Sequence, residues 1–178
     1  MFFLSALPRE LWIPGFVGLF LAVLLGMTLH EFAHNYVASL MGDPMPARWG
    51  KLTLNPMVHI YWPGFIMWLI IGFGILGTAP IDPYRIPLQN RRWGYLAAVA
   101  AGPISNLILA AILALIYRVA NIQSYELRVV LLLMINLNAL MFLFNLLPFS
   151  PLDGWTIVYS LLPADLADSW AQQKQTTY

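Results

Sequence analysis

Two things are scarce in this sequence, cysteine and charge. None of its 178 residues is a cysteine, which excludes disulfides and thiolate metal ligands. Charged residues make up only 10% of the chain, where a soluble domain carries roughly a quarter. Because so few charges cannot cover a water-facing surface, and because 60% of the residues are hydrophobic, the sequence predicts an integral membrane protein. The net charge of +1 gives no reason to expect nucleic acid as a partner.

Long apolar runs predict an all-α, polytopic helical bundle in which three core transmembrane helices form one domain over residues 1–178. The three spans are expected at residues 11–40, 93–117 and 127–147. The last residues, 168–178, form a polar tail. No internal repeat and no soluble domain is apparent in the sequence.

The most informative stretch is His30-Glu31-Phe32-Ala33-His34, at the end of the first apolar run. Two histidines four residues apart lie on one face of a helix, where both imidazoles can reach one zinc ion. Glu31 is then placed as the general base that activates a zinc-bound water. Three ionisable groups inside a membrane span are costly, so their presence there indicates function.

A catalytic zinc commonly takes three protein ligands, so a third ligand is needed for the one zinc ion expected per chain. The chain has only eight acidic residues, which allows a search by elimination. Asp153 follows the break after the last span and is the best candidate. Asp82 and His59 are weaker candidates.

The segment 62–78 is apolar but short, and it decides the topology. If it crossed the membrane, Asp153 and the two histidines would lie on opposite faces. We therefore expect it to be re-entrant or to lie at the surface. That arrangement gathers five basic residues on the side of the motif, and the positive-inside rule then makes this side cytoplasmic. The five are Arg48, Lys51, Arg85, Arg91 and Arg92.

Substrate would be a membrane-embedded peptide segment that must unwind locally, since a helix hides its peptide bonds. Residues 48–54 have partial strand character, and we expect a small β element there at the membrane surface. Its residues Leu52, Thr53 and Leu54 would pair with the extended substrate through backbone hydrogen bonds. Asn145, beside the proline break, is a candidate clamp for a substrate amide.

These residues resemble the site-2 protease family of intramembrane zinc metalloproteases, in a minimal form without a PDZ or CBS domain. The resemblance covers about residues 25–155. It is carried by the histidine motif and by three further stretches: Leu52-Thr53-Leu54-Asn55-Pro56, Ala101-Gly102-Pro103-Ile104-Ser105-Asn106, and Asn145-Leu146-Leu147-Pro148-Phe149-Ser150-Pro151-Leu152-Asp153-Gly154. Relatives often carry an aspartate after the His-Ile pair, where this chain has Tyr61.

The resemblance implies that His30, His34 and Asp153 bind zinc and that Glu31 is the base. It also implies that Asn106 and Asn145 lie close to the site, where both are candidate substrate-binding residues. The implied activity is regulated cleavage of transmembrane proteins or peptides within the lipid bilayer. We expect a multi-pass protein of a prokaryotic cell membrane, with its active site nearer the cytoplasmic face.

Other functions stay open on the residues alone. A metal transporter or channel would also hold a His/Glu/Asp cluster, although the sequence shows no inverted repeat. A scaffold that only binds membrane segments would not need Glu31. A metalloprotease with a glutamate as third ligand is disfavoured, because Glu126 is the sole glutamate after the motif and lies at the far end of its helix.

Overall fold

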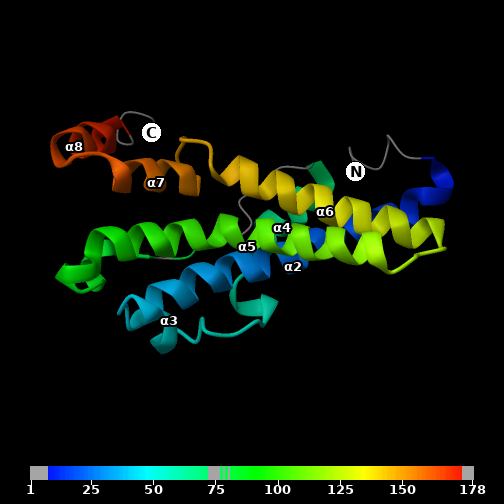
Figure 1. Cartoon of the computed structure of the whole chain (residues 1–178), viewed down its shortest axis with the longest axis horizontal. Coiled ribbons are helices and arrows are strands. Elements are labelled where there is room, and N and C mark those ends of the chain that lie inside the picture. Colours follow the sequence, from blue (N-terminus) through cyan, green and yellow to red (C-terminus); the bar gives the residue numbers. More distant parts are fainter. Residues whose placement is uncertain (1–7, 72–76, 78, 80, 174–178) are drawn as a thin grey trace.

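The fold is a bundle of three long helices with most of the shorter helices toward one end (Figure 1). The computed structural model describes residues 8–71, 77, 79 and 81–173. Its α-helices are α2 (Trp12–Leu40), α3 (Met45–Arg48), α4 (Trp62–Ile71), α5 (Arg91–Val119), α6 (Tyr125–Asn145), α7 (Asp153–Leu161) and α8 (Ala164–Gln173). Short 3-10 turns are η1 (Arg9–Leu11), η2 (Pro56–Val58), η3 (Pro83–Arg85) and η4 (Leu88–Asn90).

The three long helices are the predicted core spans. Each is long and apolar enough to cross a membrane, with candidate spans at Arg9–Leu40, Leu88–Val119 and Tyr125–Asn145. They pack against one another, and α5 runs opposite to α2 and α6 (Figure 1). The helical membrane bundle expected from the sequence is therefore confirmed. The described part of the polar tail, residues 168–173, belongs to α8.

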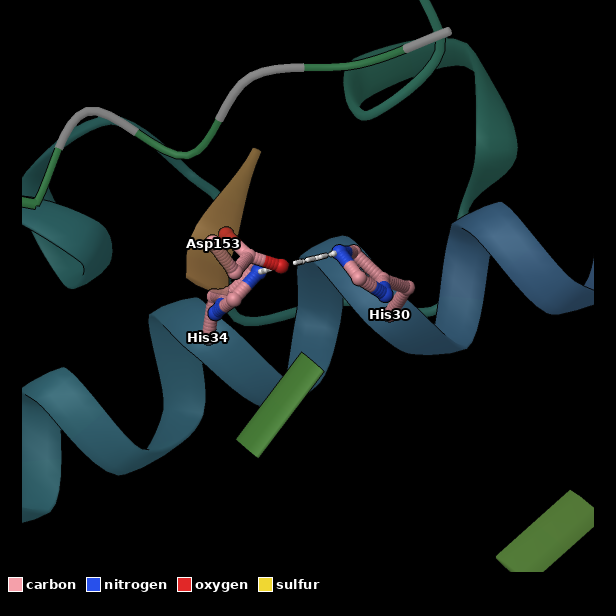
Figure 2. Close-up of side chains that lie close together, drawn as sticks. All are labelled: His30, His34 and Asp153. Atoms are coloured by element: carbon pink, nitrogen blue, oxygen red, sulfur yellow. Dashed lines mark hydrogen bonds and ion pairs between the residues drawn. The ribbon is translucent and has the colours of Figure 1, made fainter. Parts of the chain in front are cut away.

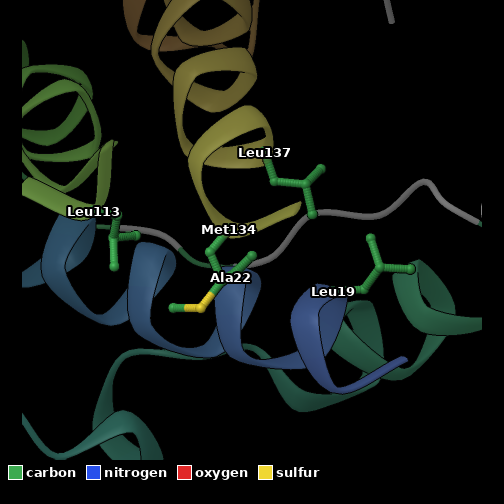
Figure 3. Close-up of a cluster of buried hydrophobic side chains, with 5 residues drawn as sticks. All are labelled: Leu19, Ala22, Leu113, Met134 and Leu137. Atoms are coloured by element: carbon green, nitrogen blue, oxygen red, sulfur yellow. The ribbon is translucent and has the colours of Figure 1, made fainter. Parts of the chain in front are cut away.

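All three long helices contribute to the hydrophobic core between them. The buried cluster consists of Leu19 and Ala22 from α2, Leu113 from α5, and Met134 and Leu137 from α6 (Figure 3). The outward faces of the same helices are also apolar: Ile108, Leu115 and Leu143 are each more than half exposed. An apolar exterior of this kind suits contact with lipid and would be costly in water.

The connector between α2 and α5 begins and ends at the same end of the bundle. A Cβ atom added to Gly42, just after α2, would lie 2.7 Å from the Cδ atom of Pro87, just before α5. Asp43, only 1% exposed, pairs with Arg85 at 4.0 Å between Oδ2 and Nε. The connector therefore leaves the bundle and returns to it on one side.

The predicted re-entrant segment lies within this connector. Helix α4 has ten residues, which rise about 15 Å, half of the ~30 Å hydrocarbon core of a bilayer. Ile60 and Gly77 form an antiparallel bridge, so the chain returns beside the point where it left. Residues 72–76 and 78 lie outside the described residues. This geometry supports the re-entrant interpretation, which stays a prediction.

The predicted β element at 48–54 is wrong, because no residue of that stretch belongs to a strand. Arg48 closes the helical turn α3, and Gly50 has a φ of 65°, which breaks an extended strand. Side chains then bond the loop to itself: Lys51 Nζ donates to the Val58 carbonyl, and His59 Nε2 lies 2.6 Å from the Thr53 carbonyl oxygen. Among the described residues, the strand-like pairing is at Ile60 and Gly77.

Candidate active site

Three candidate ligand atoms converge in the half of the bundle that carries the connector. His30 and His34 project from α2, and Asp153 reaches them from the first residue of α7 (Figure 2). Asp153 Oδ2 lies 3.2 Å from His30 Nε2 and 3.4 Å from His34 Nε2. Both histidines are buried. The structure therefore brings together the three residues predicted from the sequence as metal ligands.

The two imidazoles are held by hydrogen bonds on their far sides. His30 Nδ1 lies 2.7 Å from Asn106 Oδ1, and His34 Nδ1 lies 2.8 Å from the carbonyl oxygen of Ala98. Both partners are acceptors, so each Nδ1 carries the proton and donates it. Each Nε2 is then left with a bare lone pair that faces the centre of the site.

The positions of the two Nε2 atoms show whether the site can hold a metal ion. The two Nε2 atoms lie 3.0 Å apart. Two bare lone pairs cannot hydrogen bond to one another, and both face the carboxylate oxygen of Asp153. Two neutral imidazoles and one carboxylate, with their ligand atoms within 4.8 Å of one another, are a donor set that zinc binds. The residues present therefore fit a single zinc ion.

Asn106 is placed behind His30, outside the wall of the cavity. It is fully buried, and its Nδ2 atom donates to the Gly26 carbonyl at 3.1 Å and to Asn138 Oδ1 at 3.0 Å. Asn138 is also fully buried and donates in turn to the Met134 carbonyl at 2.8 Å. This chain of donors fixes the orientation of the Asn106 amide and hence the tautomer of His30.

The sequence did not predict a role for Asn138 near the site. It lies on α6 with Asn136 and Asn145, and nothing in the local pattern separates the three. Asn136 is exposed and donates to the Leu132 carbonyl of its own helix. A buried asparagine at membrane depth needs a partner, but the sequence does not show which asparagine faces inward.

Close approach of α5 to the histidines requires a residue without a side chain. A Cβ atom on Gly102 would overlap His34 Nε2 and would lie 2.8 Å from His30 Nε2. Gly102 and Ala98 lie four residues apart on one face of α5. Gly102 leaves room for both imidazoles, and the Ala98 carbonyl accepts a hydrogen bond from one of them.

Glu31 lies beside the ligands and is only 3% exposed. Its Oε2 atom is buried and has no hydrogen-bond partner among the described residues. Gly77 covers the other oxygen so closely that an added Cβ atom would lie 2.7 Å from Glu31 Oε1. A buried carboxylate oxygen without a hydrogen bond is costly, which indicates that Glu31 is kept for chemistry rather than stability.

Asp153 owes its position to the chain break before α7. Helix α6 ends at Asn145, and Pro148 and Pro151 prevent it from continuing. Gly154 then packs directly on the carbonyl oxygens of Leu146 and Leu147. The chain thus turns back sharply after α6, and the first residue of α7 points at the histidines of α2.

A cavity of about 680 Å³ opens onto His30, Glu31, His34 and Asp153. Its wall is mostly apolar, with contributions from α2, α4, α5, α6 and α7. Asn145 lines it, as expected of a candidate substrate clamp, and donates to the Met141 carbonyl at 2.9 Å. Leu52, Thr53 and Leu54 are not among the lining residues.

The two weaker candidates for third ligand lie elsewhere. Asp82 caps η3 through the Tyr84 N–H and pairs with Arg85 at 3.4 Å. His59 faces the Thr53 carbonyl, and burial lowers its pKa below the ordinary value. Neither joins the cluster of ligand atoms around Asp153.

A centre of two buried histidines and one partly buried aspartate beside a glutamate, set in a bundle of apolar helices, is the arrangement of a membrane zinc metalloprotease. The chain is 37% identical, over 82% of its length and 69% of the relative's, to YwhC of Bacillus subtilis (strain 168), provisionally named a zinc metalloprotease. It is 29% identical, over 90% of its length and 64% of the relative's, to Rip2 of Mycolicibacterium smegmatis (strain ATCC 700084 / mc(2)155), named in the same way. No family model and no solved structure matches the chain. The chain belongs to the site-2 protease family.

Proposed function

We propose that this protein is an intramembrane endopeptidase that hydrolyses peptide bonds within or near the transmembrane segments of membrane-anchored proteins. One zinc ion per chain would be held by His30, His34 and Asp153. The observation that carries the proposal is the convergence of these three candidate ligands beside Glu31, whose Oε2 atom has no hydrogen-bond partner among the described residues. Cleavage of such substrates would serve regulated intramembrane proteolysis.

The depth of the site supports a membrane-embedded substrate. His30 lies ten residues before the C-terminal end of α2, which places it about 15 Å from that end of the helix. The surrounding cavity is lined mainly by apolar side chains such as Val23, Leu137 and Phe144. A cavity of this composition would take an apolar segment more readily than a charged, water-soluble peptide.

Zinc, when bound, would lower the pKa of a water molecule and polarise the carbonyl of the scissile bond. The protein supplies the remaining chemistry. The carboxylate of Glu31 accepts the proton of the attacking water and passes it to the nitrogen of the leaving amine. Asn106 and the Ala98 carbonyl hold the two imidazoles so that their Nε2 atoms face the reacting centre.

Substrate would bind in an unwound conformation, because the bond must be exposed before water can attack it. Asn145 lies at the cavity wall, and we propose that its side-chain amide bonds the freed backbone of the substrate. A role for Leu52, Thr53 and Leu54 stays a prediction. Those residues would have to contact substrate outside the cavity, since they do not line it.

We also propose that the site lies nearer the cytoplasmic face. The connector and the start of α5 carry most of the basic residues of the chain at the end of the bundle that holds the site. The opposite end carries Arg9, Arg118 and Arg128. This bias follows the positive-inside rule.

Cleavage of a single-span substrate in detergent tests the proposal, with zinc content measured on the same samples. Wild type should bind zinc and cleave, and Glu31→Gln should bind zinc without cleaving. Glu126→Gln is the matched control, because Glu126 is exposed in the first turn of α6, away from the site. Activity that survives Glu31→Gln would refute the mechanism.

The ligand assignment has its own test. Asp153→Ala should lower the zinc content of the purified protein, because two histidines alone hold the metal weakly. Asp82→Ala should leave the zinc content unchanged. Equal zinc in the Asp153→Ala protein and wild type would exclude Asp153 as a ligand.

A further inference from the structure

Helix α7 carries Asp153 at its first residue, and a single arginine of α5 caps its other end. Arg92 Nε lies 3.0 Å from the Ser160 carbonyl oxygen, and its Nη2 atom lies 2.9 Å from that of Leu161. A third, longer contact of 3.4 Å reaches the Leu162 carbonyl. The guanidinium therefore donates to three successive carbonyls at the C-terminal end of α7.

The chemistry of the contact suits a cap. The last carbonyls of a helix have no partner within the helix, and they carry its partial negative charge. A planar guanidinium offers several donors in a fixed fork and keeps its charge at any physiological pH. Arg92 satisfies the carbonyls and neutralises the helix end in one contact.

A second contact holds α7 to the same helix. The Tyr95 side chain of α5 lies close enough to the Thr156 side chain of α7 for the two to interact. Thr156 lies three residues after Asp153, on the same side of a nine-residue helix. Arg92 and Tyr95 thus attach α7 at its end and near its start.

These attachments belong to a stripe along α5 that also contacts the histidines. Its members follow one another at intervals of three or four residues, so they lie on one face of the helix. They are Arg92, Tyr95, Ala98, Gly102 and Asn106. One face of α5 therefore holds the helix of Asp153 at one end and both imidazoles at the other.

We propose that Arg92 is a positioning residue that sets the distance between Asp153 and the histidine pair. The inference rests on the proposed function, because it assumes that these three residues share one zinc ion. Helix α7 follows a break at Pro148 and Pro151, so contacts with α5 add to the packing of Gly154 in determining where it lies. Loss of the cap frees the C-terminal end of α7 and lets Asp153 move out of reach of the metal.

The test is zinc affinity, measured by competition with a chelator of known affinity. Arg92→Gln should weaken zinc binding about tenfold, as expected when a residue that orients a ligand is lost. Arg92→Lys should fall between Arg92→Gln and wild type, because an ammonium keeps the charge but not the fork. Arg91→Gln is the matched control, since Arg91 lies over the Tyr84 ring and not on α7.

A double-mutant cycle separates positioning from a general structural role. In the Asp153→Asn background, Arg92→Gln should change zinc affinity no further, because the ligand it positions has already been removed. The thermal stability of the zinc-free protein serves as a second measurement. An equal loss of affinity in both backgrounds, or unchanged affinity in Arg92→Gln, would overturn the inference.

Failure of the proposed function and failure of the role of Arg92 give different results. If wild type binds no zinc, the proposed function fails and the inference fails with it. If wild type binds zinc and cleaves substrate while Arg92→Gln matches it in both respects, only the role of Arg92 is refuted.

Discussion

The Nδ1 atom of His30 lies 2.7 Å from the Oδ1 atom of Asn106, 76 positions away in the sequence. This bond joins the first ligand on α2 to α5, and Asn138 extends it to α6. Each of the three membrane-spanning helices thus contributes to the orientation of one imidazole. The consequence is that a residue on α6, with no contact to the metal, should affect metal binding.

Asn138→Leu should therefore weaken zinc binding, because the Asn106 amide loses one of the two acceptors that fix its orientation. A loss of about tenfold is expected for a residue that supports a ligand indirectly. Chelator competition provides the measurement. Asn136→Leu makes the same chemical change on the exposed face of α6 and should leave zinc affinity as in wild type.

Gly102→Ala should abolish zinc binding in a protein that still folds. The added methyl group overlaps the Nε2 atom of His34, so the imidazoles must turn away or α5 must shift. Overpacking of this kind costs about 1–3 kcal/mol in stability. Zinc content and thermal unfolding are measured together. Ile104→Ala, two residues along on the outward face, is the control and should keep its zinc.

Residues 57 and 88 should be accessible from the same side of the membrane. Met57 and Leu88 are 64% and 75% exposed and lie on either side of the predicted re-entrant segment. Because the chain has no cysteine, Met57→Cys and Leu88→Cys give clean single labels for a membrane-impermeant reagent. Tyr125→Cys marks the opposite end of the bundle and should label from the other side. Labelling of 57 and 88 from opposite sides would show that the segment crosses.

Removal of zinc should lower the temperature of unfolding in detergent. A ligand present at a thousandfold excess over its dissociation constant stabilises the folded state by about 4 kcal/mol, and a chelator removes that contribution. Glu31→Gln should lose as much stability as wild type on chelation, because its ligands are intact. Asp153→Ala should lose less, because it binds less zinc at the start.

Local sequence was enough to predict the long helices and three candidate ligands whose side chains the structure brings together. Apolar runs predict the spans directly, since the cost of exposing backbone in lipid allows few other structures. Asp153 is predicted as the third ligand because few acidic residues compete with it and because the proline break places it near the end of a span. Both predictions rest on a strongly biased composition: long apolar runs in the first case and a scarcity of acidic residues in the second.

The rest depends on contacts that no local pattern encodes. The strand predicted at residues 48–54 is wrong because Gly50 turns the chain and because Lys51 and His59 bond to nearby carbonyls. Asn138 and Asn136 look alike in sequence, and only the packing of α6 against α5 distinguishes them. Arg92 counts in the sequence as one more basic residue at a membrane surface, and its role as a cap becomes visible only once α7 is placed.

The stripe on α5 also limits how the protein can change. Insertion of one residue between Tyr95 and Gly102 would rotate the two halves of the helix by about 100° relative to each other. The half that holds α7 would then turn toward lipid while the half that holds the histidines stayed in place. Chimeras between relatives should therefore exchange residues 91–106 as one block, since the two halves of the metal site share a single helical register.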